Sequence, residues 1–246
     1  MKVNEVIAKT ALSKSNLPGL DYSLNPYRGC SHACTYCYAP LVLREKRAWG
    51  EFVDVKINLP SVLARELSTK QKGTIGIGTV TDPYQPIEKK YELTRKCLEA
   101  LLKKDWPISI QTKSDLVLRD LDLIEKFREK DIGFTITTLD DCARKRFEPH
   151  SSSIPARLNA LEETTRKGIR TWVFLGPIIP DLIGETLEDL IKGLGEIGID
   201  HLLFDRLRIK PGMKGFSEYR RTDYGRIENE IKELCSKYKV KCQQAF

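Results

Sequence analysis

Six short apolar segments, each followed by a stretch of helical length, constrain the fold of this 246-residue chain more than any other feature. Apolar strands that alternate with amphipathic helical stretches are typical of parallel α/β proteins. The expected strands are residues 21–27, 74–80, 108–112, 133–138, 170–177 and 201–207. The expected helices are residues 60–69, 87–103, 116–130, 155–167, 186–197 and 217–238.

The expected strands are mostly apolar, so helices should cover their outer side. In a parallel barrel, functional groups gather on the loops that leave the carboxyl ends of the strands. Polar and conformationally special residues follow the strands here, at residues 25–30, 81–86, 113–115, 139–142 and 176–180. No composition shift marks a boundary. We therefore expect one domain over residues 1–246, with an amino-terminal extension of residues 1–20 and a carboxyl-terminal helical tail of residues 215–246.

Composition restricts the compartment and the partners. The chain has seven cysteines, three of them crowded together, which does not resemble the disulfide framework of a secreted protein. No run reaches the roughly 18 consecutive apolar residues of a membrane helix, and the first residues lack the apolar stretch of a signal peptide. We expect a cytoplasmic protein without a membrane partner. Its net charge of +7 is compatible with nucleic acid as a partner, and equally with an ordinary solvated surface.

Three cysteines follow the first expected strand with C-x3-C-x2-C spacing: Cys30, Cys34 and Cys37. This loop predicts a metal site. Iron–sulfur clusters are usually held by four thiolates, so a three-cysteine loop would leave one iron with open positions for a substrate or cofactor. Zinc is the alternative, because His32 and the three cysteines make a tetrahedral Cys3His set. His32 lies between two of these ligands, however, where reaching the same ion would strain the loop.

At these residues the sequence resembles the radical S-adenosylmethionine (radical SAM) superfamily, which has this triad with an aromatic residue before the last cysteine. Tyr36 occupies that position. The resemblance extends over residues 25–38, 78–88, 112–114, 135–137 and 147–149, and it is closest to the spore photoproduct lyase-like branch. Similar segments in the same order are a stronger signal than one motif.

The resemblance implies a partial (β/α)6 TIM-type barrel with parallel strands and outer helices. It also implies a 4Fe–4S cluster on Cys30, Cys34 and Cys37, with S-adenosylmethionine bound to the fourth iron. The expected enzyme is of the lyase or oxidoreductase type. It would cleave S-adenosylmethionine reductively to a 5′-deoxyadenosyl radical, which abstracts hydrogen from an unidentified substrate. The cofactors would carry the chemistry, and the protein would supply orientation and a dry enclosure.

Further cofactor-binding residues are implied by the resemblance, beside Tyr36. Thr81 and Asp82 would hold the methionine amino group, and Lys113 the methionine carboxylate. Thr135, with Thr137 on the same face of the strand, would meet the ribose. The alternative for each of these residues is ordinary turn or strand chemistry.

Other residues are candidates for substrate contact. Cys142 follows the fourth strand and is a candidate hydrogen-atom donor, although a thiol without a role fits that position as well. Glu148 is a candidate for orienting the substrate or cofactor, with a surface salt bridge as the alternative. Arg206 and Arg208 would project to one face of an extended segment and could bind a phosphate or another acidic group.

Further features of the sequence bear on the substrate and on the source of the electron. Spore photoproduct lyases have a hydrogen-donating cysteine where this chain has Val80, so thymine-dimer repair is disfavoured. Radical modification of a nucleic acid or of a protein side chain is a second hypothesis, and a zinc-stabilised nucleic-acid-binding module without redox chemistry is the alternative from another class. With no flavin motif and no second cysteine cluster, the enzyme would need an external one-electron reductant of the ferredoxin or flavodoxin type.

Overall fold

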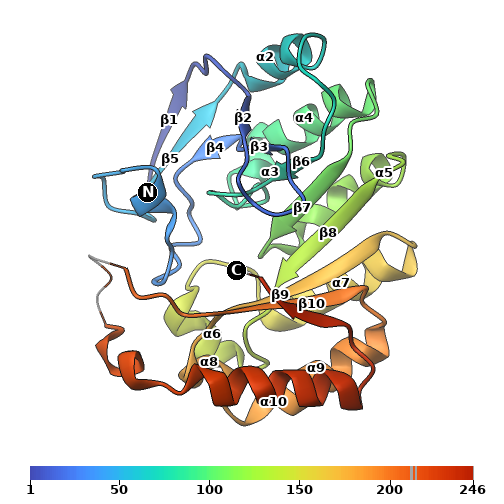
Figure 1. Cartoon of the computed structure of the whole chain (residues 1–246). Helices are drawn as coiled ribbons and strands as arrows, with labels where there is room; N and C mark the ends of the chain where they lie inside the picture. Colours follow the sequence, from blue (N-terminus) through green and yellow to red (C-terminus); the bar gives the residue numbers. More distant parts are fainter. Residues whose placement is uncertain (211–212, 214, 246) are drawn as a thin grey trace.

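The computed structural model describes residues 1–210, 213 and 215–245 (Figure 1). Its main sheet has eight strands in the order β11-β10-β9-β8-β7-β6-β3-β2. All neighbouring pairs are parallel except β2 and β3, which are antiparallel. The strands are β2 (Leu12–Lys14), β3 (Tyr22–Leu24), β6 (Ile75–Ile77), β7 (Ile108–Thr112), β8 (Lys130–Thr135), β9 (Arg170–Ile178), β10 (His201–Arg206) and β11 (Cys242–Gln244).

The six strands from β3 to β10 in this sheet correspond one by one to the six predicted strands, in the predicted order. The predicted α/β class with a mostly parallel sheet is confirmed. Within the described residues, β2 and β11 stand at the two ends of the strand order, so the sheet is open. No helix in the described part of the chain is both long and apolar enough to cross a membrane.

A second sheet of three strands lies beside the first and positions the cysteine loop. Its order is β1 (Lys2–Val6), β5 (Phe52–Lys56) and β4 (Tyr27–Arg28). Gly29 follows β4 with a φ of +87°, and a Cβ atom there would lie 2.3 Å from the carbonyl oxygen of Phe52. Only glycine tolerates both the backbone conformation and this close approach. The chain therefore enters the cysteine loop held tightly against β5.

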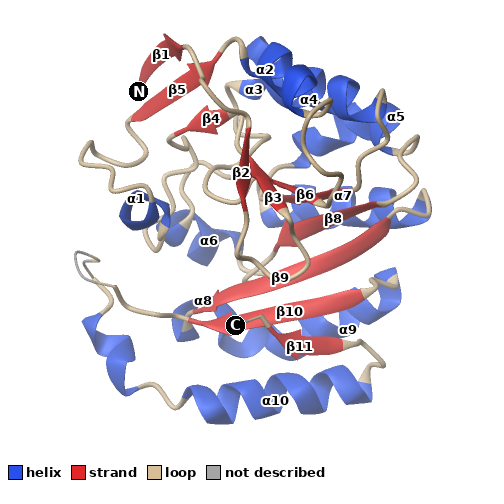
Figure 2. Cartoon of the chain, turned by 45° about the horizontal axis from the view of Figure 1, so that its top comes forward, coloured by secondary structure: helices blue, strands red, loops and turns tan. Residues whose placement is uncertain are grey.

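Helices cover the outer side of the main sheet (Figure 2). The apolar core lies between them, with Ile75, Ile110 and Phe134 fully buried on three neighbouring strands. Each such side chain contributes roughly 1.5–3 kcal/mol to stability. The helices are α1 (Ala39–Val42), α2 (Leu59–Glu66), α3 (Glu88–Tyr91), α4 (Leu93–Leu102), α5 (Leu121–Ile124), α6 (Asp141–Phe147), α7 (Ile154–Arg166), α8 (Pro180–Ile183), α9 (Leu187–Ile197) and α10 (Tyr224–Lys237). Short 3-10 helices are Asp115–Asp120, Gly184–Thr186 and Ser217–Arg221.

The predicted continuous helix over residues 87–103 is wrong, because the chain breaks between α3 and α4. Glu92 has a left-handed conformation with a φ of 51°. The break lets the buried carboxylate of Glu88 accept a hydrogen bond from the backbone N–H of Thr94, at 3.0 Å, in the first turn of α4. A side chain that caps the next helix is incompatible with one uninterrupted helix.

The predicted helix over residues 116–130 is also wrong. This segment forms a 3-10 helix and the four residues of α5, and β8 begins at Lys130 rather than at residue 133. Asp131 explains the early start of the strand, since its Oδ1 accepts hydrogen bonds from Ser109 Oγ at 2.6 Å and from Trp172 Nε1 at 2.7 Å. These partners on β7 and β9 stabilise a polar segment within the sheet.

The ends of the chain contain strands that the sequence pattern did not indicate. Within residues 1–20, β1 pairs with β5 and β2 pairs with β3. Residues 215–246 include the 3-10 helix at Ser217–Arg221 and α10, and they end in β11, which pairs with β10. The predicted helix over residues 217–238 therefore starts later, at Tyr224, where the side chain of Asp223 accepts a hydrogen bond from the N–H of Arg226.

Candidate active site

The cysteine loop joins β4 to α1 through two tight turns. The N–H of Ala33 donates to the carbonyl of Cys30 at 3.3 Å, and the N–H of Cys37 donates to the carbonyl of Cys34 at 3.1 Å. Burial raises the pKa of Cys34 well above its usual value, and the neighbouring Glu148, Cys37 and Cys30 act in the same direction. The loop therefore gathers three thiols at one end of the main sheet.

Backbone N–H groups point at these thiols. Burial raises the pKa of Cys30 to about 12, against the opposing effect of N–H groups of Asp82 and His32 that hydrogen-bond its sulfur. Burial likewise raises the pKa of Cys37, and the N–H of Ala39 and the indole of Trp49 act to lower it. Such donors stabilise a thiolate, the form in which cysteine binds a metal.

Gln85 fastens the cysteine loop to the loop that follows β6. Its side chain is fully buried. Its Oε1 accepts a hydrogen bond from the N–H of Ser31 at 2.9 Å, and its Nε2 donates to the carbonyl of Gly29 at 3.3 Å and to Thr81 Oγ1 at 3.0 Å. Thr81 in turn donates to the carbonyl of Gly29 at 2.6 Å. The sequence analysis did not single out Gln85, whose only signal was its place within residues 78–88.

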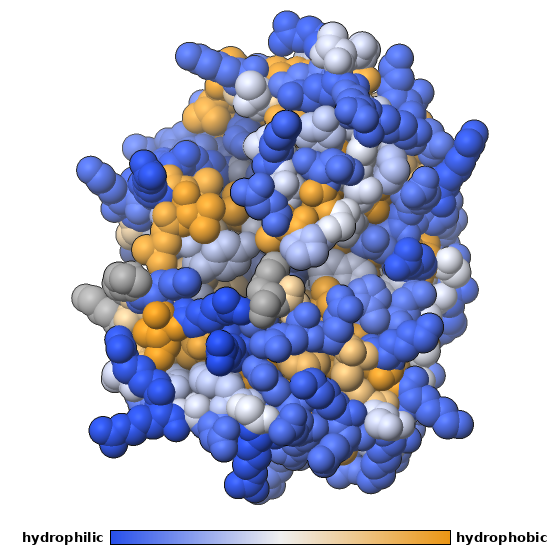
Figure 3. Space-filling view, in the orientation of Figure 1, coloured by the Kyte–Doolittle hydropathy of each residue, from blue (hydrophilic) through white to orange (hydrophobic). Residues whose placement is uncertain are grey.

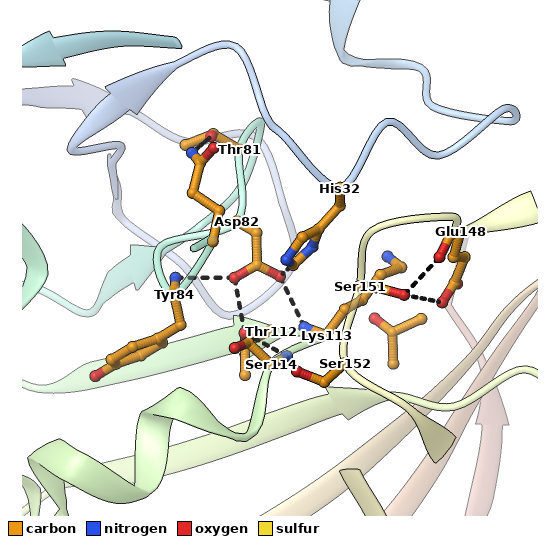
Figure 4. Close-up of polar contacts among 12 residues, drawn as sticks. His32, Thr81, Asp82, Tyr84, Thr112, Lys113, Ser114, Glu148, Ser151 and Ser152 are labelled. Carbon is orange, nitrogen blue, oxygen red and sulfur yellow. Dashed lines mark hydrogen bonds and ion pairs between the residues drawn. The ribbon is translucent and has the colours of Figure 1, made fainter. Parts of the chain in front are cut away.

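Asp82 is the centre of the polar contacts in Figure 4. Its Oδ1 accepts hydrogen bonds from Thr112 Oγ1 at 2.7 Å and from the N–H of Tyr84 at 2.9 Å, and its Oδ2 accepts one from the N–H of Lys113 at 2.7 Å. His32 Nδ1 lies 3.4 Å from Oδ2. Burial acts to raise the pKa of Asp82, but His32 and the hydrogen bonds lower it to about 2. The carboxylate therefore joins the loops that follow β6 and β7.

Lys113 brings a positive charge to the cysteines. Its Nζ lies 5.7 Å from the centroid of the Tyr36 ring. Burial acts to lower the pKa of Lys113, yet the nearby Cys34 and Glu148 raise it, so the side chain stays an ammonium. Within the described residues this ammonium makes no hydrogen bond or ion pair through Nζ. It is available to an anionic group.

A buried ion pair supports Tyr36 from the other side. The hydroxyl of Tyr36 donates to Glu148 Oε1, and Arg157 pairs with Glu148 Oε2. Arg157 also donates to the carbonyl of Thr135 at 2.8 Å. Burial acts to raise the pKa of Glu148, but Arg157 and Lys113 lower it. Glu148 thus contacts Tyr36, a predicted cofactor residue, and it is not a surface salt bridge. The sequence analysis missed Arg157, because nothing in the pattern of α7 shows that a charged side chain is buried.

The two threonines at the end of β8 are both buried. Thr135 Oγ1 accepts a hydrogen bond from Gln111 Nε2 at 3.3 Å. The hydroxyl of Thr137 has no partner within the described part of the chain, and neither has that of Ser31 in the cysteine loop. Buried hydroxyls without partners are costly unless a ligand or water satisfies them. These two groups are therefore available to a bound molecule.

Three predicted residues lie outside this network. Cys142 is exposed in the first turn of α6, where the side chain of Asp140 accepts a hydrogen bond from its N–H. Arg206 is exposed at the end of β10, and Arg208 Nη2 lies 3.2 Å from Asp205 Oδ1. Between the two arginines, Leu207 is buried in the same apolar cluster as Tyr36. The arginines therefore flank a residue that packs with the cysteine loop, whereas nothing in the described residues joins Cys142 to it.

A family model decides the identity. The model for the radical SAM superfamily matches residues 24–194, which is more than half of the chain and contains the whole network described above. The chain belongs to the radical SAM superfamily. As a radical SAM enzyme, it comes from a family whose members use a 4Fe–4S cluster and S-adenosylmethionine.

Other proteins and solved structures are similar to this chain over most of its length. An uncharacterised protein of Methanocaldococcus jannaschii is 40% identical over 185 residues, which cover 74% of this chain and 70% of that protein. A radical SAM Nalpha-GlyT isomerase of Pseudomonas phage M6 is 24% identical, over 72% of this chain and 38% of its own length. Spore photoproduct lyase complexed with dinucleoside spore photoproduct has a TM-score of 0.75 at 18% identity, over 99% of this chain and 82% of that one. At that identity, the likeness shows the fold.

The residues present fit the cofactors of the family. Three neighbouring thiols with N–H donors suit a cluster that spreads its ligands over several irons. Among the residues that the structure describes, the hydroxyls of Thr137 and Ser31 have no partner, and the ammonium of Lys113 lies 5.7 Å from the Tyr36 ring. A single zinc ion fits less well. Across the described residues no group of three His, Cys, Asp or Glu side chains is arranged to hold one metal ion, and His32 Nδ1 faces Asp82. The zinc-stabilised module is not favoured.

Proposed function

We propose that this radical SAM enzyme holds a 4Fe–4S cluster on Cys30, Cys34 and Cys37 and binds S-adenosylmethionine beside it, at the open end of a partial (β/α)6 barrel. The observation that carries the proposal is Lys113 Nζ, which lies 5.7 Å from the ring of Tyr36 in the cysteine loop and forms no hydrogen bond or ion pair with the residues that the structure describes. When both groups are bound, one electron cleaves the carbon–sulfur bond of the sulfonium, which yields methionine and a 5′-deoxyadenosyl radical that abstracts hydrogen from the substrate. A cytoplasmic location suits these thiols, because they must stay reduced.

The residues of the chain bind and orient these groups. Lys113 would pair with the methionine carboxylate. Asp82 accepts hydrogen bonds from the N–H of Lys113 and the hydroxyl of Thr112, so it positions the lysine. With the N–H of Tyr84, its side-chain oxygens already accept three hydrogen bonds. The hydroxyl of Thr81 is also engaged, with Gly29 and Gln85, so the backbone carbonyls of its loop would meet the amino group. The hydroxyl of Thr137 would form a hydrogen bond with the ribose.

Water must be kept from the radical, and an apolar cluster over the cysteine loop serves this purpose. It is formed by Tyr36 of the cysteine loop, by Phe147 at the end of α6 and by side chains from the segments that follow β9 and β10. Cys34 packs against it. Its buried members are Tyr36, Phe147, Ile179, Leu182, Leu207, Phe216 and Tyr219.

Cluster removal tests the proposal. After anaerobic reconstitution the wild-type protein should contain about four irons and four sulfides per chain. It should also form 5′-deoxyadenosine when dithionite and S-adenosylmethionine are added. Cys34→Ala should lose both the cluster and this product, whereas Cys142→Ala, at an exposed thiol, should keep both. Production of 5′-deoxyadenosine by the Cys34 variant, or one zinc per chain in the wild type, would refute the assignment.

A nucleic acid is the substrate class that we propose. Arg206 and Arg208 flank Leu207, which belongs to the same apolar cluster as Tyr36, and Arg208 is also paired with Asp205 at 3.2 Å. Phosphate contacts of this kind provide most of the affinity for nucleic acids. A neighbour in fold, spore photoproduct lyase, is described in complex with a dinucleoside spore photoproduct. The reaction should differ from dimer repair, since Val80 cannot return a hydrogen atom as the cysteine of that enzyme does.

Salt-dependent binding tests the substrate class. Filter binding of single-stranded and double-stranded DNA and of RNA should show an affinity that falls steeply as salt rises. Arg206→Ala combined with Arg208→Ala should weaken it by roughly tenfold and should lower the slope of log affinity against log salt by about 1 for each lost phosphate contact. The matched control removes two cations at the far end of the strands, Lys103→Ala with Lys104→Ala, which lie exposed before β7. Absence of any salt-dependent affinity would leave a protein side chain as the substrate.

A further inference from the structure

The proposed chemistry consumes one electron for each cleavage, and the chain offers no second centre to supply it. Four cysteines remain outside the cluster loop. Cys97 is buried in α4, Cys142 is exposed in α6, and Cys235 and Cys242 neighbour each other at α10 and β11. This arrangement cannot hold a second four-thiolate cluster. The electron must therefore enter from another molecule, through the protein surface nearest the cysteine loop.

That surface carries exposed apolar side chains. Tyr38, Leu41 and Val42 are 49%, 44% and 61% exposed, and they start at the residue that follows Cys37. We call these three residues the α1 patch. Figure 3 shows exposed apolar side chains on the left of the molecule, the side on which the amino terminus is marked in Figure 1. The hydroxyl of Tyr38 donates to the carbonyl of Thr79 at 2.8 Å, which holds the patch against the loop that follows β6. Exposed apolar groups of this kind mark interaction sites.

The rim of the α1 patch is positively charged. Arg44 and Lys46 are exposed and form no ion pair within the residues that the structure describes. Glu45 lies between them, but Arg28 at 2.9 Å and Arg47 at 2.8 Å already neutralise its carboxylate. The rim therefore presents two uncompensated cations to a partner.

The rim is held in place and is joined to the cysteine loop. The guanidinium of Arg47 lies 3.6 Å from the centroid of the Phe52 ring and pairs with Asp54 on β5 at 2.7 Å. Trp49 packs on the same ring, edge to face, with 6.0 Å between centroids. Phe52 also lies against Gly29 at the start of the cysteine loop, where an added Cβ atom would meet its carbonyl oxygen at 2.3 Å. The segment of residues 44–49 and the cysteine loop are thus both anchored on the same residue of β5.

We propose that the α1 patch and its basic rim are the docking surface for an acidic one-electron carrier protein of the flavodoxin or ferredoxin type. This inference rests on the proposed function. The reduced carrier loses one electron, and the oxidised cluster beside Cys37 gains it, with no bond made or broken. An apolar centre allows close approach, and the cations attract the acidic face of the carrier. A polyanionic nucleic acid would also be attracted by the rim, but it would gain little from an apolar centre.

Electron transfer from a protein carrier tests the docking surface directly. Cluster-loaded enzyme is mixed with reduced flavodoxin, and the rate of cluster reduction is followed in a stopped-flow spectrometer at several salt concentrations. Arg44→Glu with Lys46→Glu should lower the second-order rate constant by roughly tenfold at low salt, and the difference should shrink as salt rises. Leu41→Ser with Val42→Ser should lower it at every salt concentration. Reduction by dithionite should be unchanged in both variants.

The control carries the same change of charge elsewhere: Lys103→Glu with Lys104→Glu should react with flavodoxin like the wild type. Equal flavodoxin rates for the rim variant and the wild type would overturn the docking surface, and so would an equal loss with dithionite. Loss of nucleic-acid affinity in the rim variant, with its flavodoxin rate intact, would assign the surface to the substrate instead. Failure of the wild type to cleave S-adenosylmethionine even with dithionite would overturn the proposed function itself.

Discussion

The residues of this site fall into two groups. In the first group the polar atoms already have hydrogen-bonding partners within the protein, and in the second group they do not. Asp82, Glu148 and Gln85 have their polar atoms engaged by neighbouring loops and helices, so they build the site. The hydroxyl of Thr137 has no partner among the described residues, and Lys113 Nζ forms no hydrogen bond or ion pair with them, so both groups remain for a ligand. The sequence motif named Asp82 and Lys113 as equal candidates. Only the contacts separate the residue that positions from the residue that binds.

Lys113→Ala should therefore weaken the binding of S-adenosylmethionine and leave the cluster in place. A hydrogen bond to a charged group contributes about 1.5–3 kcal/mol, which corresponds to a loss of roughly 10–150-fold in affinity. Equilibrium dialysis with the cluster-loaded protein measures the affinity, and iron analysis measures the cluster. Lys113→Arg, which keeps the charge, should recover part of the affinity. Loss of iron in the alanine variant would show that Lys113 holds the loop rather than the cofactor.

The residues that carry chemistry were largely predictable from the sequence, whereas their supports were not. Cysteine spacing and the order of motifs indicated Cys30, Cys34, Cys37 and Lys113 before any contact was known. Arg157 gave no such signal, because a charged side chain in a helix is usually solvated. Its burial depends on Glu148, which belongs to a different element. Pairings between distant residues are a property of the fold and are not written in local sequence.

At the scale of elements, a side chain fixes how α6 meets α7. Asp141 accepts two hydrogen bonds from Arg144, at 2.9 and 3.0 Å, and one from the N–H of Ile154 at 3.0 Å, which is the first residue of α7. These contacts lower the pKa of Asp141 to about 2, with the Arg144 hydrogen bonds as the main cause. The charged carboxylate thus stabilises the corner that carries Glu148.

This contact has a defined pH dependence. Because the pKa of Asp141 is lower in the folded protein than the usual value of about 3.9 in an unfolded chain, its contribution to the free energy of unfolding is complete above about pH 4. The contribution is lost as the pH falls through about 2. Asp141→Asn should be less stable than the wild type at neutral pH, and the two should converge toward pH 2. Urea denaturation of both metal-free proteins measures this, and a constant difference at every pH would contradict it.

The strands of the central sheet were predicted better than the helices and the strand β5. The six central parallel strands have apolar sequences, because helices cover them. Breaks inside helical stretches were missed at Glu92 and after Asp120. There, carboxylates of Glu88 and Asp120 bond to groups on other elements, and these bonds override the local helical pattern. The strand β5 was missed for a related reason, since Asp54 interrupts its apolar sequence and is buried only through Arg47 and Asn4.

At the scale of the whole molecule, the site is formed by loops that follow several strands, and no single helix or strand contains it. The cysteine loop follows β4, Gln85 and Asp82 follow β6, Lys113 follows β7, and Thr137 follows β8. The loops of β6, β7 and β8 enter at the carboxyl ends of parallel strands, and the cysteine loop joins them from β4 of the second sheet. A ligand that fills this meeting point contacts most of the sheet through its loops. Ligand binding should therefore stabilise the entire fold.

Thermal unfolding of the cluster-loaded protein tests this coupling. S-adenosylhomocysteine, which lacks the sulfonium and is not cleaved in the same way, serves as the probe. At 100 times its dissociation constant it should add about 2.7 kcal/mol to the free energy of unfolding. For a domain of this size, each kcal/mol raises the melting temperature by about 2–4 °C, so the expected shift is roughly 5–10 °C. Cys34→Ala should show no shift, because the cluster that anchors the ligand is lost. An equal shift in that variant would place the ligand away from the cysteine loop and would separate its site from the thiols.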